Sequence, residues 1–131
     1  MRALRILYVE DNLDIRDALA EILGEGGHAV VACANGEEAL VAYGAEPFDL
    51  ILTDVSLPGL SGIEMARRAL ATHPHQWVVF CSGYELGPGL AAIGRNVRSL
   101  TKSFEMEALF ALLDAIAVEL DAAPPAEPGS A

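Results

Sequence analysis

The sequence has little positive charge and no long apolar run. Eight Lys and Arg residues stand against 19 Asp and Glu residues, which gives a formal net charge of −11. Because such a charge repels polyanions at long range, nucleic acid and anionic membranes are poor direct partners. No apolar run approaches the ~20 residues that span a bilayer, and the N-terminus lacks the apolar core of a signal peptide. We therefore expect a cytoplasmic protein.

Cysteines are also scarce. Cys33 and Cys81 lie far apart in apolar runs, and there is no CxxC pair. This spacing favours buried free thiols in a reducing compartment over a disulfide or a cysteine metal site. The 131 residues are enough for one domain that buries its apolar surface without such cross-links.

Short apolar runs alternate with segments of helical periodicity along the chain. The expected strands cover 4–9, 28–33, 49–53, 76–81 and 97–101, and the expected helices cover 13–23, 37–43, 61–72 and 104–121. A helix within 85–96 should be short or frayed, because three glycines and a proline interrupt it. This alternation predicts an α/β fold with a parallel sheet and helices on both faces. We expect one domain over 1–121 and a disordered tail over 122–131.

The carboxyl ends of parallel strands meet at one edge, where open α/β sheets bind ligands. The side chains that close the expected strands are Glu10, Asp11, Asp54, Ser82 and Lys102. Taken alone, Asp54 fits a structural role at a strand end or helix cap and a chemical role at a site equally well. Three crowded carboxylates repel, however, at a cost on the order of 4 kcal/mol per pair for an effective dielectric of about 20. Oxygen ligands without Cys or His favour Mg²⁺ as the counter-charge, commonly completed by a phosphate.

The motifs YVEDN and LTDVSLPGLSG, with a strand-ending Ser and a later strand-ending Lys, resemble those of bacterial two-component receiver domains (response regulators) over residues 4 to 120. The resemblance implies a flavodoxin-like, doubly wound (βα)5 fold with strand order 2-1-3-4-5. It makes Asp54 the phosphoacceptor, supplied by a histidine kinase or a histidine phosphotransfer protein. Ser82 would hydrogen-bond the phosphoryl group and Lys102 would pair with it. The implied magnesium ligands are Glu10, Asp11, Asp54 and the backbone carbonyl of Ser56.

Three positions depart from the usual receiver pattern. Ser99 stands where many receivers have Tyr or Phe, so the usual aromatic switch is missing. The segment FCSGY resembles the FAT-GUY subgroup, and its Tyr84 could cover the phosphoryl group, share in switching, or simply pack on its loop. Ser103 replaces the usual proline, so a cis bond there costs about 2.5–4 kcal/mol. We expect Lys102–Ser103 to be cis, because Lys102 must still reach Asp54; a trans bond that places Lys102 differently is the alternative.

The leading functional hypothesis is a stand-alone phosphorylation switch or phosphate sink that signals by protein contact, since no output region follows Asp121. Its only reactions would be its own phosphorylation and dephosphorylation, so we do not expect an enzyme. A receiver excised from a hybrid kinase or a larger regulator is one alternative. Another is an Asp-nucleophile phosphohydrolase, although such enzymes commonly need a second acid where Ser56 stands. A dinucleotide- or flavin-binding protein is disfavoured, because no GxGxxG follows the first strand.

Overall fold

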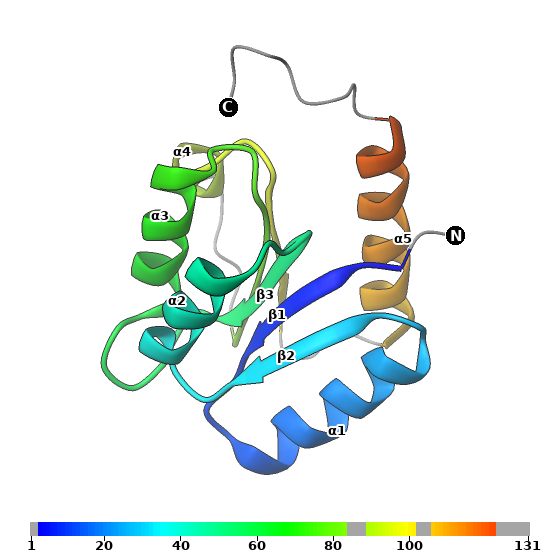
Figure 1. Cartoon of the computed structure of the whole chain (residues 1–131), viewed down its shortest axis with the longest axis horizontal. Helices are drawn as coiled ribbons and strands as arrows, with labels where there is room; N and C mark the ends of the chain where they lie inside the picture. The colour runs from blue at the N-terminus through cyan, green and yellow to red at the C-terminus, as the bar shows by residue number, and fades with distance from the viewer. Residues whose placement is uncertain (1–2, 84–88, 102–105, 123–131) are drawn as a thin grey trace.

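The computed structural model describes residues 3–83, 89–101 and 106–122, in which strands and helices alternate (Figure 1). The elements are β1 (Arg5–Val9), α1 (Leu13–Glu25), β2 (Ala29–Cys33), α2 (Gly36–Ala45), β3 (Leu50–Asp54), α3 (Gly62–Thr72), β4 (Trp77–Ser82), α4 (Leu90–Ile93), β5 (Val97–Thr101) and α5 (Met106–Ala122). The fourth helix is four residues long, so the prediction of a short helix is confirmed. The expected tail lies outside the described residues apart from Ala122, which ends α5, and the predicted domain boundary stays a prediction.

All five strands pair in parallel, in the order β2-β1-β3-β4-β5. This order confirms the predicted doubly wound, flavodoxin-like architecture. The central strand, β3, has hydrogen-bonded neighbours on both sides, and each of its residues is buried. The apolar run that ends at Asp54 is therefore buried on both faces of the sheet, as its composition predicts.

Helices cover both faces of the sheet (Figure 1). On one face α2 and α3 pack through Ala39, Met65, Ala66, Ala69 and Leu70 onto side chains that include Leu7, Ile51 and Phe80. On the other face α1 and α5 pack through Leu23, Leu109, Leu113, Ile116 and Ala117 onto side chains that include Ile6, Leu52 and Val79. Alternate residues of each inner strand thus serve opposite cores, which explains why these strands are apolar at nearly every position.

Side-chain caps fix where three of the helices begin. The Oδ1 atom of Asn12 accepts a hydrogen bond from the backbone N–H of Ile15 at 3.0 Å, so Asn12 rather than Asp11 caps α1. Asn35 and Ser61 cap α2 and α3 in the same way. Each of these caps satisfies a backbone donor that has no partner within its own helix.

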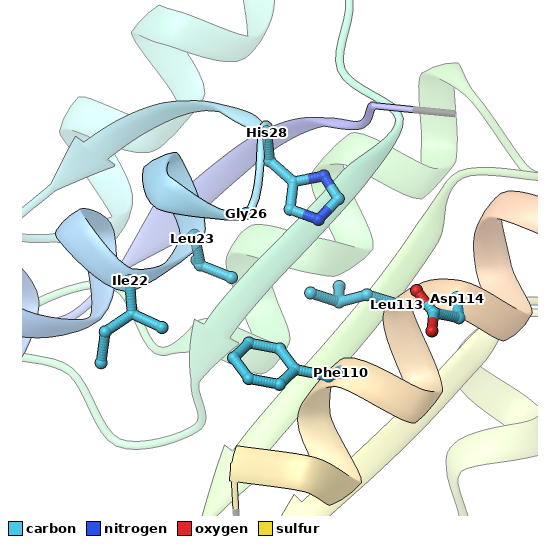
Figure 2. Close-up of a pocket in the computed structure, with 7 residues that line it drawn as sticks. All are labelled: Ile22, Leu23, Gly26, His28, Phe110, Leu113 and Asp114. Atoms are coloured by element: carbon cyan, nitrogen blue, oxygen red, sulfur yellow. The ribbon is translucent and has the colours of Figure 1, made fainter. Parts of the chain in front are cut away.

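Apolar side chains of α1 and α5 line a groove of about 260 Å³ (Figure 2). Its walls are formed by Ile22, Leu23, Phe110 and Leu113, with His28 and Asp114 also in the lining. The last turns of α1 and the start of β2 contribute to it, so it lies toward the amino ends of the strands and away from Asp54. None of the described helices is long and apolar enough to cross a membrane.

Candidate functional site

The first acid of the site, Glu10, follows β1 and is held mainly through its backbone. Its side chain is buried, and its N–H donates to the carbonyl of Cys33 at 3.0 Å, which continues the pairing of β1 with β2. Its carbonyl accepts a hydrogen bond from Nη1 of Arg16 at 2.9 Å. Its carboxylate accepts one from the N–H of Asn12 at 3.1 Å. Residues of the turn into α1 and of α1 itself therefore hold both the backbone carbonyl and the carboxylate of Glu10.

The second anchor of the site, Asp54, is the last residue of β3 and is 3 % exposed. It lies beside Cys81 of β4 in the parallel register. Its backbone carbonyl accepts a hydrogen bond from Oγ1 of Thr53 at 3.0 Å.

Cys81 and Cys33 are both buried and neither forms a disulfide, which confirms the prediction of buried free thiols.

The carboxylates of Glu10, Asp11 and Asp54 meet at the carboxyl edge of the sheet. One oxygen from each lies within 4.8 Å of the others. Burial, together with a hydrogen bond to Asp54, raises the pKa of Glu10 from 4.5 to about 7. Burial and the two nearby acids also raise the pKa of Tyr8. The three acids predicted to crowd this edge therefore do so, and the charges of Glu10 and Asp54 also act on the neighbouring Tyr8.

The composition of this cluster fits a hard divalent cation. Its ligand atoms are all carboxylate oxygens, and no His or Cys is part of it. Magnesium prefers such oxygen ligands, binds through one or two carboxylates and retains several waters. The fourth predicted protein ligand is the backbone carbonyl of Ser56, an exposed residue two positions beyond Asp54 in the loop that follows β3.

The remaining predicted site residues belong to β4, β5 and the loops that follow them. Ser82 ends β4 and is buried, in register with Thr101 at the end of β5. Ser99 is exposed and pairs in register with Phe80. Lys102, Ser103 and Tyr84 lie outside the described residues, and so does the peptide bond predicted to be cis.

Sequence reasoning missed several residues that support the site. Arg16 contacts the backbone of Glu10, and Thr53 contacts that of Asp54. Glu37, in the first turn of α2, contacts the loop between β3 and α3. These are hydrogen bonds between side chains and main-chain atoms, so no residue pattern marks them.

Comparison with known proteins decides the family. The model of the response regulator receiver domain matches residues 6–114. The chain belongs to this family. A response regulator receiver protein from Brucella abortus, CpdR, is 37 % identical over 108 residues, which cover 80 % of this chain and 89 % of the relative. The chain is therefore a receiver domain, the phosphorylation-dependent signalling switch of two-component systems.

Other relatives and solved structures agree with this assignment. FleR of Pseudomonas aeruginosa is 33 % identical over 119 residues, which cover 85 % of this chain but only 24 % of FleR. The crystal structure of the response regulator TrrA of Thermotoga maritima in complex with Mg²⁺-BeF has a TM-score of 0.76 and 28 % identity. That match covers 86 % of this chain and 97 % of TrrA. Receiver domains thus occur both alone and as parts of longer proteins.

Proposed function

We propose that this receiver accepts a phosphoryl group on the carboxylate of Asp54. The observation that carries the proposal is the meeting of three acids, two of them buried, at the carboxyl edge of the sheet. Burial of an acid at the end of a central strand costs stability, and such acids cluster at functional sites. The phosphoryl donor is a histidine kinase or a histidine phosphotransfer protein, the kind of partner with which receivers interact.

The reaction transfers the phosphoryl group from one atom to another without a change in oxidation state. A carboxylate oxygen of Asp54 attacks phosphorus in line with the nitrogen of the donor phosphohistidine. The phosphorus–nitrogen bond breaks, an acyl phosphate forms on Asp54, and the imidazole leaves with a proton from solvent. Water later attacks the same phosphorus, which returns the Asp54 carboxylate and releases inorganic phosphate.

Glu10, Asp11, Asp54 and the carbonyl of Ser56 are the residues that would hold magnesium. When bound, the ion neutralises the acids and the charge on the transferred oxygens. Glu10 and Asp11 would position it, and the contacts of Asn12 and Arg16 fix Glu10 at the turn into α1.

Two further groups are proposed to bind the phosphoryl oxygens. The hydroxyl of Ser82, at the end of β4, donates a hydrogen bond to one oxygen. Lys102, which lies outside the described residues, pairs with another. The readout falls to Tyr84, Ser99 and Ser103, because the position of the usual aromatic switch holds the exposed Ser99. The resemblance to the FAT-GUY subgroup supports this division.

The output is proposed to be contact with another protein. A net charge of −11 disfavours direct binding to nucleic acid or to anionic membranes. A cytoplasmic location is part of the proposal. The domain catalyses only its own phosphorylation and dephosphorylation, and has no turnover of an external substrate.

The test is to incubate the protein with magnesium and acetyl phosphate or phosphoramidate and to measure intact mass. Wild type should gain one phosphoryl adduct that is stable in acid and labile in base, and Asp54→Ala should gain none. Asp14→Ala, which removes an exposed acid from the first turn of α1, should behave as wild type. No adduct on wild type, or an undiminished adduct on Asp54→Ala, would refute the proposal. Continuous release of phosphate from phosphate esters would instead indicate a phosphohydrolase.

A further inference from the structure

The loop between β3 and α3 is tied to the first turn of α2 by one charged side chain. The backbone N–H of Leu60 donates a hydrogen bond to Oε1 of Glu37 at 2.9 Å. Glu37 and Leu60 are 23 residues apart in sequence, so this contact joins two neighbouring βα units. Hydrogen bonds with a charged acceptor are among the stronger ones in proteins.

The base of the same loop is closed by backbone hydrogen bonds. The N–H of Gly62 donates to the carbonyl of Val55 at 2.9 Å, and the N–H of Val55 donates to the carbonyl of Cys81 at 3.2 Å. The residues between Val55 and Gly62 therefore form a loop anchored at both ends to the sheet. Ser56 lies on it, exposed, just after the base.

Within the part of the chain that the structure describes, the far side of the loop has no such backbone anchor, and it rests on α2. A side chain at Gly36 would meet the carbonyl oxygen of Leu60 at 3.1 Å, so α2 and the loop approach each other closely there. Gly59 has a φ of +72°, a conformation that favours glycine. Both carboxylate oxygens of Glu37 lie 3.2 Å from the position that a Cβ of Gly59 would take. The carboxylate of Glu37 thus binds the loop at Leu60 and fills the space beside Gly59.

We infer that Glu37 is a positioning residue for the magnesium site. It holds the β3–α3 loop against α2, and so holds the backbone carbonyl of Ser56 in place beside Asp54. The side chain of Ser56 is exposed, whereas its neighbours Val55 and Leu57 pack in or against the core. Glu37 adds an anchor at the far side of the loop. This inference rests on the proposed function of the site, and it makes α2 part of the machinery that supports the metal.

The test compares Glu37→Ala with Glu37→Gln. An amide oxygen can still accept the hydrogen bond from Leu60, whereas alanine cannot. Magnesium affinity is measured by calorimetry on the unphosphorylated protein, and the magnesium dependence of phosphorylation is measured with acetyl phosphate. We expect Glu37→Ala to weaken magnesium binding roughly threefold to tenfold, as for loss of one supporting hydrogen bond. Glu37→Gln should stay close to wild type, and the phosphorylation rate of Glu37→Ala should recover at saturating magnesium.

Two further variants separate position from charge. Glu38→Gln removes a neighbouring negative charge of the same helical turn, but its carboxylate accepts a hydrogen bond from Asn35 rather than from the loop. It should leave magnesium affinity unchanged. Gly36→Ala changes no charge but pushes against Leu60, and it should weaken magnesium binding as Glu37→Ala does. Circular dichroism and thermal unfolding verify that each variant is folded.

Each outcome decides the inference separately from the proposed function. Unchanged affinity in Glu37→Ala overturns the inference while leaving phosphorylation of Asp54 intact. Equal losses in Glu37→Ala, Glu37→Gln and Glu38→Gln would mean that only the local field matters, and would also overturn it. Failure of wild type to bind magnesium overturns it as well. If wild type binds magnesium but is not phosphorylated, the proposed function fails and the affinity comparison still stands.

Discussion

The backbone carbonyl oxygen of Asp54 occupies the space that a side chain at Gly62 would need. The first residue of α3 therefore lies directly against the end of β3, backbone to backbone. The hydrogen bond from the N–H of Gly62 to the carbonyl of Val55 depends on the same approach. A glycine at this position is a steric requirement of the site, although its φ is not positive.

Gly62→Ala should destabilise the domain and impair phosphorylation. The added methyl group must displace the backbone at Asp54, and we expect the free energy of unfolding to fall by about 1–3 kcal/mol, as for other overpacked sites. Urea denaturation measures this change. Gly44→Ala is a matched control, because no atom lies within 4 Å of its new Cβ and the site is helical. It should raise stability by up to about 1 kcal/mol, and a Gly62→Ala variant as stable as wild type would contradict the steric argument.

Asp11→Asn should stabilise the protein in magnesium-free buffer. The substitution removes one of three carboxylates whose oxygens lie within 4.8 Å of one another. Asp11 is exposed and screened by water, so loss of its repulsion with the other two acids is worth about 1 kcal/mol. Addition of magnesium should reverse the order, because only wild type retains the full set of acids and gains stability by binding the ion. Urea denaturation with EDTA or with magnesium tests both statements. Stabilisation of wild type and variant by equal amounts would exclude Asp11 as a ligand.

The stability of the magnesium-free protein should depend on pH through Glu10. Its pKa in the folded protein is raised from 4.5 to about 7, chiefly by burial. The folded state therefore binds this proton more tightly than the unfolded state does. The contribution of Glu10 to the free energy of unfolding is full below about pH 4.5 and is lost as the pH rises through 7. We expect a loss of roughly 1–3 kcal/mol across this window. Because other groups titrate as well, the difference between wild type and Glu10→Gln is the quantity to measure, and a pH-independent difference would contradict the prediction.

The fold was predictable from sequence because its pattern is local and repeated. Apolar runs such as 50–53 need only be long enough for a strand and be followed by turn residues, and right-handed crossovers then set the architecture. Two side-chain contacts lie beside strand starts that differ from the prediction. The N–H of Leu4 donates to Nδ1 of His28 at 3.0 Å, and that of Arg5 donates to Oδ2 of Asp49 at 2.9 Å. The strands that begin beside these contacts start one residue later than predicted.

The acids of the site were predictable for a related reason. In a parallel sheet the residue that closes each strand reaches the common edge, so Glu10, Asp11 and Asp54 could be brought together before any coordinates were known. The supports of the site could not. Arg16 and Glu37 bind main-chain atoms, and a main-chain partner leaves no mark on residue identity. The family pattern predicts that Lys102 joins these acids at the site, and this stays a prediction.

The central place of β3 in the sheet separates the reactive residue Asp54 from the surface that a partner protein can contact. Backbone amides in a strand that is paired on both sides and buried throughout exchange with solvent only through large-scale opening. Asp54 therefore lies on one of the most rigid parts of the described structure. A partner cannot contact that buried strand directly. A change caused by modification of Asp54 must therefore be transmitted through the segments that follow the strand ends.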